Sequence, residues 1–257
     1  MRQRKIIPGV DPKLLIKDAA ALMPDPARRG FLRGAASLGA LAFLTGCDII
    51  DGDSAEAVLR KISSFNDGAQ AALFSRTKLV PTYPESAIKR PFPFNAYYDE
   101  DEAPEVDGGK YRFEIAGLVD NKKPWTLDEL HALPEVSQIT RHVCVEGWSA
   151  IGSWQGAVLS DFLKRIGADT SAKYIWFKCA EGYTNTIDMP TALHPQTQMT
   201  FKFADETLPR KFGFPMKIRI PTKLGFKNPK HVIALNVTNK DLGGYWEDRG
   251  YNWFSGL

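Results

Sequence analysis

Apolar and polar residues alternate along several short stretches of the chain, and this two-residue period predicts β-strands. The clearest case is 111–119, where the alternation ends at the turn pair Asp120-Asn121. Further strands are expected at 138–146, 174–179, 216–220 and 232–237, which are rich in β-branched or aromatic residues.

Three segments have helical features instead. Residues 126–133 begin with Thr126 followed three positions later by Glu129, a capping box, and 159–166 is amphipathic with Ser160 or a neighbour as its cap. A third helix is expected to start within 53–56. Apolar residues continue it at helical spacing (Leu59, Ile62 and Phe65). Asn66-Asp67-Gly68 is predicted to interrupt this helix before 69–74 resumes it.

Between the helix expected from 53–56 onward and the strand expected at 111–119, residues 80–98 carry four prolines among aromatic side chains: Pro81, Pro84, Pro91 and Pro93. Such a segment is predicted to be extended and to wrap over a core that buries its aromatic rings. The acidic stretch 99–107 is expected to be a solvated turn. With no internal repeat and no second linker, the pattern predicts one α+β domain, mostly strand, over 48–257.

Composition narrows the class of protein. The chain has 257 residues, 44% hydrophobic and 25% charged, with 33 Lys+Arg against 30 Asp+Glu, which is typical of a folded globular protein. Residues 1–46 hold 8 basic and 3 acidic residues, so the basic excess is N-terminal. The rest has no basic stripe interleaved with aromatics, and we expect no nucleic-acid partner. Three cysteines exclude a disulfide framework, and zinc or c-type haem spacings are absent.

Residues 1–47 have the features of a targeting segment. Arg28-Arg29 precede Phe31-Leu32 and a short apolar stretch, which resembles a twin-arginine export signal. The alternative is a basic amphipathic surface helix. Residues 44–47, Leu-Thr-Gly-Cys, resemble a bacterial lipobox in which Cys47 is lipidated; the alternative is an incidental cysteine. By analogy with known lipoproteins, Asp48 favours the inner membrane, so we predict a periplasmic protein anchored there by lipid.

Cys144 is the candidate for chemistry. A lone cysteine in a strand is usually a small buried hydrophobe. Here Arg141 and His142 are expected to lower its pKa, and a thiolate is a soft metal ligand. The segment that follows, 147–156, contains three glycines and two tryptophans, which suits a shaped cavity wall better than a plain hairpin.

Several separated motifs make the chain resemble the sulfite oxidase-fold molybdopterin oxidoreductases, and among them the periplasmic methionine-sulfoxide reductase catalytic subunit. The most specific is 141–149, Arg-His-Val-Cys-Val-Glu-Gly-Trp-Ser. Others are 94–99 (Phe-Asn-Ala-Tyr-Tyr-Asp), 208–217 (Leu-Pro-Arg-Lys-Phe-Gly-Phe-Pro-Met-Lys) and 221–230 (Pro-Thr-Lys-Leu-Gly-Phe-Lys-Asn-Pro-Lys). The resemblance extends from about residue 53 to residue 257.

The resemblance implies a set of site residues. Cys144 would bind molybdenum and be the catalytic residue. The pterin cofactor would be bound by Asn95, Tyr98, Asp99, Cys179, Phe212, Lys217, Asn228, Pro229 and Lys230. Asp99 replaces a Glu of the family, Phe212 an Asn or His, and Lys217 an Arg. Lys217 keeps the positive charge but loses the bidentate fork, and Phe212 cannot form hydrogen bonds.

The implied function is two-electron oxygen-atom transfer on a small substrate, either S- or N-oxide reduction or sulfite-type oxidation, at a molybdenum-molybdopterin cofactor. Electrons would be exchanged with a separate haem protein, a membrane cytochrome b or a soluble cytochrome c. One alternative is a non-catalytic or divergent pterin-binding protein, suggested by Phe212 and Lys217. Another is a hydrolase with Cys144 as nucleophile and His142 as base, which we expect to fail because their side chains would point to opposite faces of the strand.

Other chemically capable residues have plainer explanations. His142 is either a group that supports Cys144 or a satisfied strand histidine, and His131, His194 and His231 are expected to be structural. Trp148 and Trp154 are expected in the core. Lys223 and Lys227 share a short loop with Lys230, and Lys227 is expected to be structural or solvated.

Overall fold

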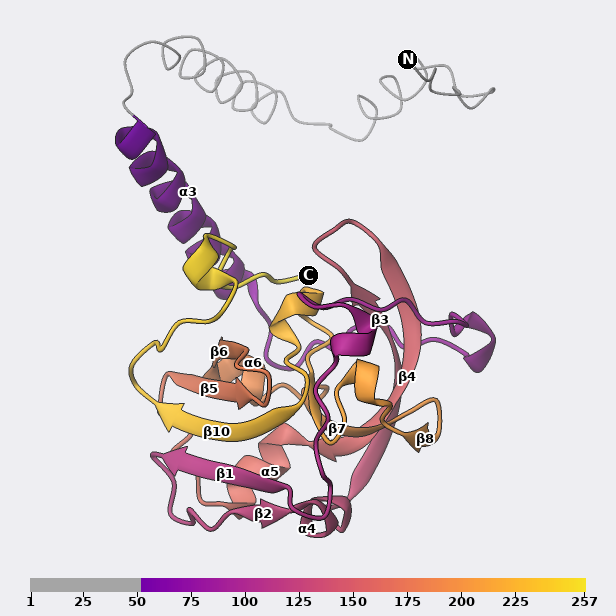
Figure 1. The fold of residues 1–257 in the computed structure, drawn as a ribbon. Helices are drawn as coiled ribbons and strands as arrows, with labels where there is room; N and C mark the ends of the chain where they lie inside the picture. The colour runs from indigo at the N-terminus through magenta and orange to yellow at the C-terminus, as the bar shows by residue number, and fades with distance from the viewer. Residues whose placement is uncertain (1–51) are drawn as a thin grey trace, which may run out of the picture. The chain divides into compact units, whose positions relative to one another are not determined.

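Two five-stranded sheets organise residues 52–257, the part of the chain that the computed structural model describes, with side chains from Glu56 onward (Figure 1). The first sheet has the order β2 (Trp125–Thr126), β1 (Arg112–Gly117), β10 (Val232–Thr238), β5 (Tyr174–Cys179) and β6 (Thr184–Asp188). The second has β3 (Glu135–Val143), β4 (Ser149–Val158), β7 (Gln198–Phe203) and β8 (Glu206–Thr207), with β9 (Lys217–Arg219) also paired to β7. The predictions for Arg28, Arg29, Cys47 and Asp48 lie outside the described residues.

Most strand pairs are antiparallel, and β1 runs parallel to β10. The predicted strands at 111–119, 138–146, 174–179, 216–220 and 232–237 correspond to β1, β3, β5, β9 and β10. The mostly β, α+β class is therefore confirmed.

The segment after Cys144 corrects one expectation. Residues 149–158 form β4, which pairs antiparallel with β3 along its whole length, so this part of the chain is a hairpin after all. Gly156 lies where β4 meets β7, and a Cβ there would approach Met199 O to within 1.9 Å. The close approach of the two backbones accounts for this glycine.

The helices are short apart from the first. The predicted capping box is present at α4 (Leu127–His131): Glu129 N donates to Thr126 Oγ1 at 3.2 Å, and Thr126 N donates to Glu129 Oε2 at 2.8 Å. Ser160 does not cap α5 (Leu159–Arg165). Its N-cap is Val158, and Leu159 N instead donates to Thr197 O at 2.9 Å, so a neighbouring segment satisfies the helix start.

The helix α3 (Gly52–Leu73) continues through Asn66-Asp67-Gly68, contrary to the predicted interruption. Asp67 contacts the C-terminal segment, because its carboxylate accepts hydrogen bonds from the backbone N–H groups of Trp253 and Phe254 at 3.3 and 2.6 Å. Tertiary contacts thus outweigh the weak helix propensity of this tripeptide. None of the helices among residues 52–257 is both long enough and apolar enough to cross a membrane.

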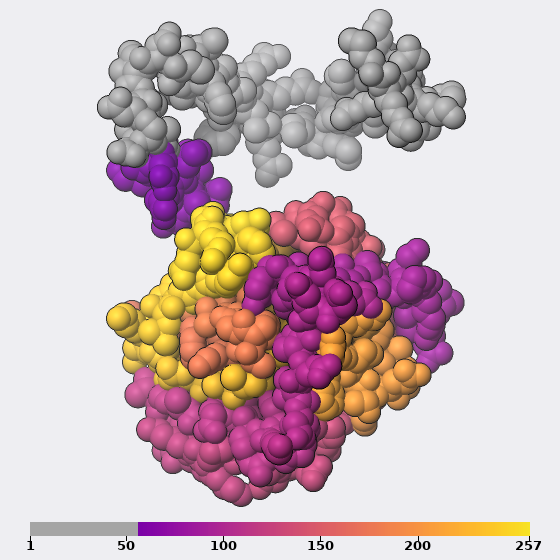
Figure 2. Space-filling view, in the orientation of Figure 1, coloured from indigo at the N-terminus to yellow at the C-terminus, as the bar shows by residue number. Residues whose placement is uncertain are grey.

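The proline-rich segment 80–98 is extended, as predicted. Tyr83 N and Lys89 N donate to Ile139 O and Ile151 O, so the segment runs along the β3–β4 hairpin. Figure 2 shows it crossing the surface over the later part of the chain. Phe92 turns inward into a small core cluster with Ala150, Trp154, Leu208 and Phe212. The larger core lies on and between the sheets, and its members include Phe113, Leu163, Phe177 and Leu235.

Candidate functional site

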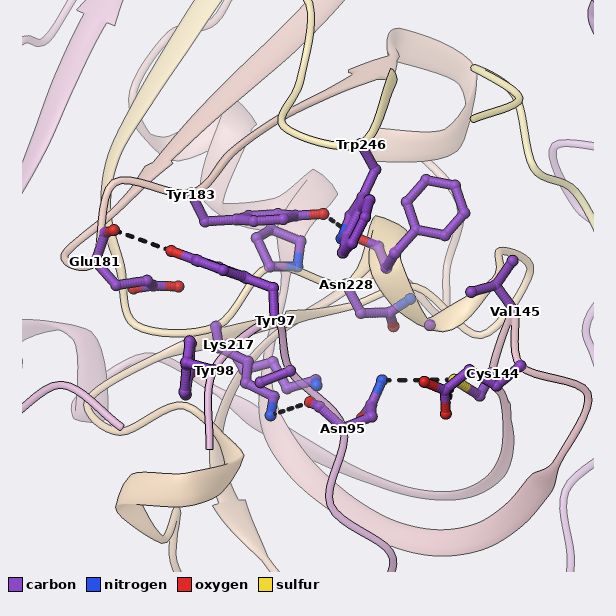
Figure 3. Close-up of a pocket in the computed structure, with 16 residues that line it drawn as sticks. Asn95, Tyr97, Tyr98, Cys144, Val145, Glu181, Tyr183, Lys217, Asn228 and Trp246 are labelled. Atoms are coloured by element: carbon purple, nitrogen blue, oxygen red, sulfur yellow. Dashed lines mark hydrogen bonds between the residues drawn. The ribbon is translucent and has the colours of Figure 1, made fainter. Parts of the chain in front are cut away.

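A cavity open to solvent, with about 640 Å³ of empty space, lies where several loops at the strand ends converge (Figure 3). We call it the Cys144 cavity; it is lined by Asn95, Ala96, Tyr97, Tyr98, Cys144, Val145, Glu146, Glu181, Tyr183, Lys217, Gly225, Phe226, Asn228, Pro229, Lys230 and Trp246. The lining thus includes most of the residues that the sequence motifs suggested.

Cys144 follows the last residue of β3 and opens the turn into β4. Its N–H donates to Trp148 O at 2.9 Å, and Gly147, with φ +92°, returns a hydrogen bond to Cys144 O. The thiol lies at the cavity wall, where it accepts a long contact from Asn95 Nδ2 at 3.9 Å and donates to Glu146 Oε2 at 3.8 Å. Burial raises the pKa of the Cys144 thiol; the Glu146 backbone N–H opposes this rise and the Glu146 carboxylate adds to it. The prediction that Arg141 and His142 lower the pKa of Cys144 is therefore wrong for the protein without a bound cofactor.

Arg141 and His142 have other surroundings. Arg141 is exposed and lies over the ring of Tyr83, 5.4 Å from its centroid. His142 is buried, and neither ring nitrogen has a hydrogen-bond partner among residues 52–257. Burial lowers the pKa of His142 well below its ordinary value, so the ring is neutral.

No hydrogen bond joins His142 to Cys144 in the described structure, and the thiol instead contacts Asn95 and Glu146. The hydrolase alternative thus lacks its nucleophile–base contact. The reason expected from the sequence was wrong, because positions two apart in a strand share a face. His142 lies within β3, which ends at Val143, whereas Cys144 lies in the turn that follows, so the rule for strand positions does not apply to this pair.

Tyr98 connects the cavity to a buried histidine. Its hydroxyl is 3.0 Å from His231 Nε2, and His231 Nδ1 is 2.7 Å from Phe214 O. Because Phe214 O can only accept, Nδ1 carries the proton and Nε2 accepts from the Tyr98 hydroxyl. Burial lowers the pKa of His231 to about 4, so it stays neutral. His231 is structural, as expected, but it also orients a cavity residue.

Two buried lysines line the cavity. Lys217, on β9, has no hydrogen-bond or carboxylate partner among the described residues, and its Nζ lies 5.4 Å from the Trp154 ring centroid. Lys230 donates to Asn95 O at 2.6 Å and to Lys211 O at 2.9 Å. Burial lowers the pKa of Lys217 well below its usual range and that of Lys230 to about 8. The cavity therefore has two lysine side chains with no carboxylate bound to them, and burial disfavours the charged form of both.

The other lysines of the same loop do not line the cavity. Lys227 is buried, forms an ion pair with Glu247 and donates to Thr186 O at 2.7 Å, so it is structural rather than solvated. Lys223 is buried against the rings of Phe74 and Phe254. Asn228 lines the cavity, but its side chain is used internally: Oδ1 accepts from Arg219 Nη1 and Ile220 N at 2.8 and 2.7 Å.

The aromatic and acidic wall was not found from the sequence. Tyr97 and Tyr183 stack at 5.9 Å between ring centroids, Tyr97 donates to Glu181 O at 3.0 Å, and Tyr183 donates to Phe226 O at 2.6 Å. Glu181 Oε2 is buried with no hydrogen-bond partner in residues 52–257, and burial raises the pKa of Glu181 to about 7. In Figure 3, Glu181 and Tyr183 lie across the cavity from Cys144. The only signal in the sequence for Glu181 and Tyr183 is Gly182, which indicates a turn between two strand-like runs.

Three of the residues that the resemblance suggested do not line the cavity. Asp99 is exposed at the start of the 3-10 turn Glu100–Glu102. Cys179 ends β5 inside the main core, where its backbone closes the tight turn that carries Glu181. Phe212 packs against Phe92 and Phe203, with ring centroids 5.6 and 4.8 Å away, because its apolar ring cannot replace a polar cavity group.

Comparisons with known proteins agree with this geometry. A family model described as the oxidoreductase molybdopterin binding domain matches residues 100–246. The chain therefore belongs to the oxidoreductases with a molybdopterin-binding domain. In fold it resembles the crystal structure of the sulfane dehydrogenase SoxCD from Paracoccus pantotrophus. That match has a TM-score of 0.51 and 20% identity, over 55% of this chain and 41% of that one.

Two proteins with related sequences carry more specific names. A protein of Azospira oryzae, provisionally named protein-methionine-sulfoxide reductase subunit YedZ1, is 58% identical over 93% of this chain and 92% of its own length. The protein-methionine-sulfoxide reductase catalytic subunit MsrP of Ralstonia nicotianae is 29% identical, over 53% of this chain and 46% of its own length.

The described residues fit a molybdenum-molybdopterin cofactor. Cys144 offers one soft thiol at the wall, and Lys217 and Lys230 offer positive charge for an anionic phosphate. Glu181 Oε2, buried without a partner, is suited to accept a hydrogen bond from an N–H of a bound ring. The stacked tyrosines provide a flat apolar surface beside it.

Proposed function

We propose that this chain is the catalytic subunit of a molybdenum enzyme that reduces methionine sulfoxide in proteins. The observation that carries the proposal is the thiol of Cys144, which lies on the wall of an open cavity that is also lined by two lysines without carboxylate partners. The names of the YedZ1 and MsrP relatives support the substrate. The reaction consumes methionine sulfoxide, two electrons and two protons, and produces methionine and water.

The bound cofactor supplies the two-electron oxygen-atom transfer. The chain's residues bind and orient it: Cys144 as thiolate ligand, Lys217 and Lys230 opposite the phosphate, and Asn95 beside the sulfur through its 3.9 Å contact. The exposed Val145 forms part of the rim, and its apolar side chain suits a methionine side chain as substrate.

The test combines metal content with turnover. Wild-type protein expressed with its signal should contain molybdenum near one per chain and reduce methionine sulfoxide in an oxidised protein when given an artificial electron donor. Cys144→Ser should abolish turnover, because a hard oxygen replaces a soft thiolate. Ser137→Ala, an exposed change at the other end of β3, is the matched control. Wild-type-like turnover in Cys144→Ser would refute the assignment.

We further propose export by the twin-arginine route, a lipid anchor on Cys47 and electron supply by a separate haem protein. Both relatives are named as subunits, which supports a partner protein. Replacing Arg28 and Arg29 with Lys should keep cofactor-loaded protein in the cytoplasm, since the pair acts as an address. Fatty-acid labelling that disappears in Cys47→Ala would identify the anchor, and unlabelled wild-type protein would exclude it.

A further inference from the structure

The helix α3 contacts the rest of the protein through a polar face. Two of its side chains bind the C-terminal segment: the Asp67 carboxylate accepts from Trp253 N and Phe254 N, and Gln70 accepts from Gly256 N at 2.8 Å. The ring of Phe74, just after the helix, meets that of Phe254 at 5.8 Å. The side of α3 that packs is therefore the side with polar residues.

The apolar side of α3 is exposed. Ile62, Phe65 and Leu73 are 51%, 75% and 87% exposed. Their spacing of three and eight residues puts them on one side of the helix, away from Asp67. We call these three residues the α3 apolar face. Water-exposed apolar rows of this kind mark a surface that binds something apolar.

This face continues into an apolar groove. Leu73 also lines an open hollow with about 1160 Å³ of empty space, together with Leu79, Pro81, Tyr83 and Leu257. Leu79 and Leu257 are exposed as well. The α3 apolar face and this groove share Leu73.

Basic side chains border this surface. Lys61, Arg76 and Lys78 are exposed, and Lys78 lines the groove with Arg141. The acidic residues of α3 are Asp53 and Glu56 in its first turns and Asp67, whose carboxylate is bound by backbone N–H groups, so the basic residues predominate only from Arg60 onward. An amphipathic helix with exposed apolar residues and basic neighbours is suited to the interface of an anionic bilayer.

The chain itself indicates which apolar partner is near. Cys47 precedes Gly52, the first residue of α3, by five positions, a length of chain that spans at most about 18 Å. We propose that the α3 apolar face and the adjoining groove lie on the surface of an anionic phospholipid bilayer. The inference rests on the proposed lipid anchor at Cys47, which keeps α3 within reach of the membrane. The contact provides a second attachment besides the acyl chains.

The experiment measures membrane binding without the anchor. The full chain carrying Cys47→Ala is mixed with vesicles of phosphatidylcholine alone or with added phosphatidylglycerol, and bound protein is measured by flotation. Binding is expected only with phosphatidylglycerol and should fall as salt is added. The double change Ile62→Glu and Phe65→Glu should lower binding about ten-fold or more, because it places charge where apolar area is buried.

The matched control is Leu118→Glu with Val136→Glu, which changes two exposed apolar residues outside this surface and should leave binding unchanged. Molybdenum content and circular dichroism of both variants show that the fold and the cofactor site persist. Equal binding by both double variants, or no binding of the parent to anionic vesicles, would overturn the proposal. The proposal would also fail if the Ile62→Glu and Phe65→Glu variant still bound vesicles but no longer co-purified with a detergent-solubilised membrane protein, because the α3 apolar face would then bind a protein rather than the bilayer. Fatty-acid labelling of wild-type Cys47 tests the anchor separately.

Discussion

Lys227 and Lys230 lie three positions apart in one loop, yet their ammonium groups have different surroundings. Lys227 is buried against Glu247 and Thr186 O, and the Trp253 ring lies 4.9 Å from its Nζ. Lys230 is also buried, but it faces the Cys144 cavity, and its two acceptors are backbone carbonyls. The same residue type thus stabilises the fold at one position and leaves positive charge available for a ligand at the other.

The carboxylates differ in the same way. Glu247 is ion-paired with Lys227 through Oε1, whereas Glu181 lies in the cavity and has no ion pair within the described structure; in both carboxylates Oε2 is buried without a hydrogen-bond partner. A charged group without a partner lowers the stability of the ligand-free protein. The comparison teaches that the cavity holds ionisable groups without ion-pair partners in the described structure, which is what our proposal of a bound cofactor requires. Four substitutions test this difference.

The largest effect is expected for Lys227→Met. Removing one member of a buried pair leaves Glu247 charged and uncompensated, which typically costs about 3–5 kcal/mol of unfolding free energy. Urea denaturation measures the loss. The double variant Lys227→Met with Glu247→Gln should recover most of it. If the single change costs less than about 1 kcal/mol, Lys227 is not the structural lysine of this loop.

Glu181→Gln should stabilise the cofactor-free protein at high pH. Burial raises the pKa of Glu181 from 4.5 to about 7, so the folded state binds this proton more tightly than the unfolded state. Its contribution to stability is therefore lost as pH rises from about 4.5 to 7. The variant should gain up to about 3 kcal/mol at pH 8 and little at pH 5. An equal gain at both pH values would show that ionisation plays no part.

Lys230→Ala should weaken retention of the cofactor while the protein still folds. It removes one charge-assisted contact to the phosphate, which is worth about 1.5–3 kcal/mol. Molybdenum per folded chain, measured at fixed salt beside wild type and Lys227→Ala, gives the answer. If Lys227→Ala loses more metal per folded chain than Lys230→Ala, the roles of the two lysines are reversed.

The smallest effect is expected for Lys211→Ala. Lys211 forms a 2.7 Å ion pair with Glu100, and both side chains are exposed. Such surface pairs contribute about 1 kcal/mol or less. Stability and molybdenum content should both stay close to those of wild type, which makes this variant the baseline for the other three. A marked loss of metal would mean that charge outside the cavity also holds the cofactor.

The local features of the sequence identified half of the strands and part of the site. Alternation predicted β1 because one face of this strand is buried, and a run rich in β-branched residues predicted β10. A capping box predicted the start of α4 because its hydrogen bonds are local. Asn95, Cys144 and Lys230 were found through short motifs, and the structure brings them to one cavity. Their roles toward the cofactor stay predictions.

The features that depend on distant contacts could not be predicted from the sequence. α3 continues through Gly68 because Asp67 binds the chain 186 residues later, and Ser160 is no cap because Thr197 O takes that place. Glu181 has no motif and became part of the cavity only through the β5–β6 turn. The sequence by itself determined five of the ten strands and singled out the thiol of Cys144. Only the tertiary structure decided which lysines and carboxylates are paired, because pairing depends on side chains brought together from different elements.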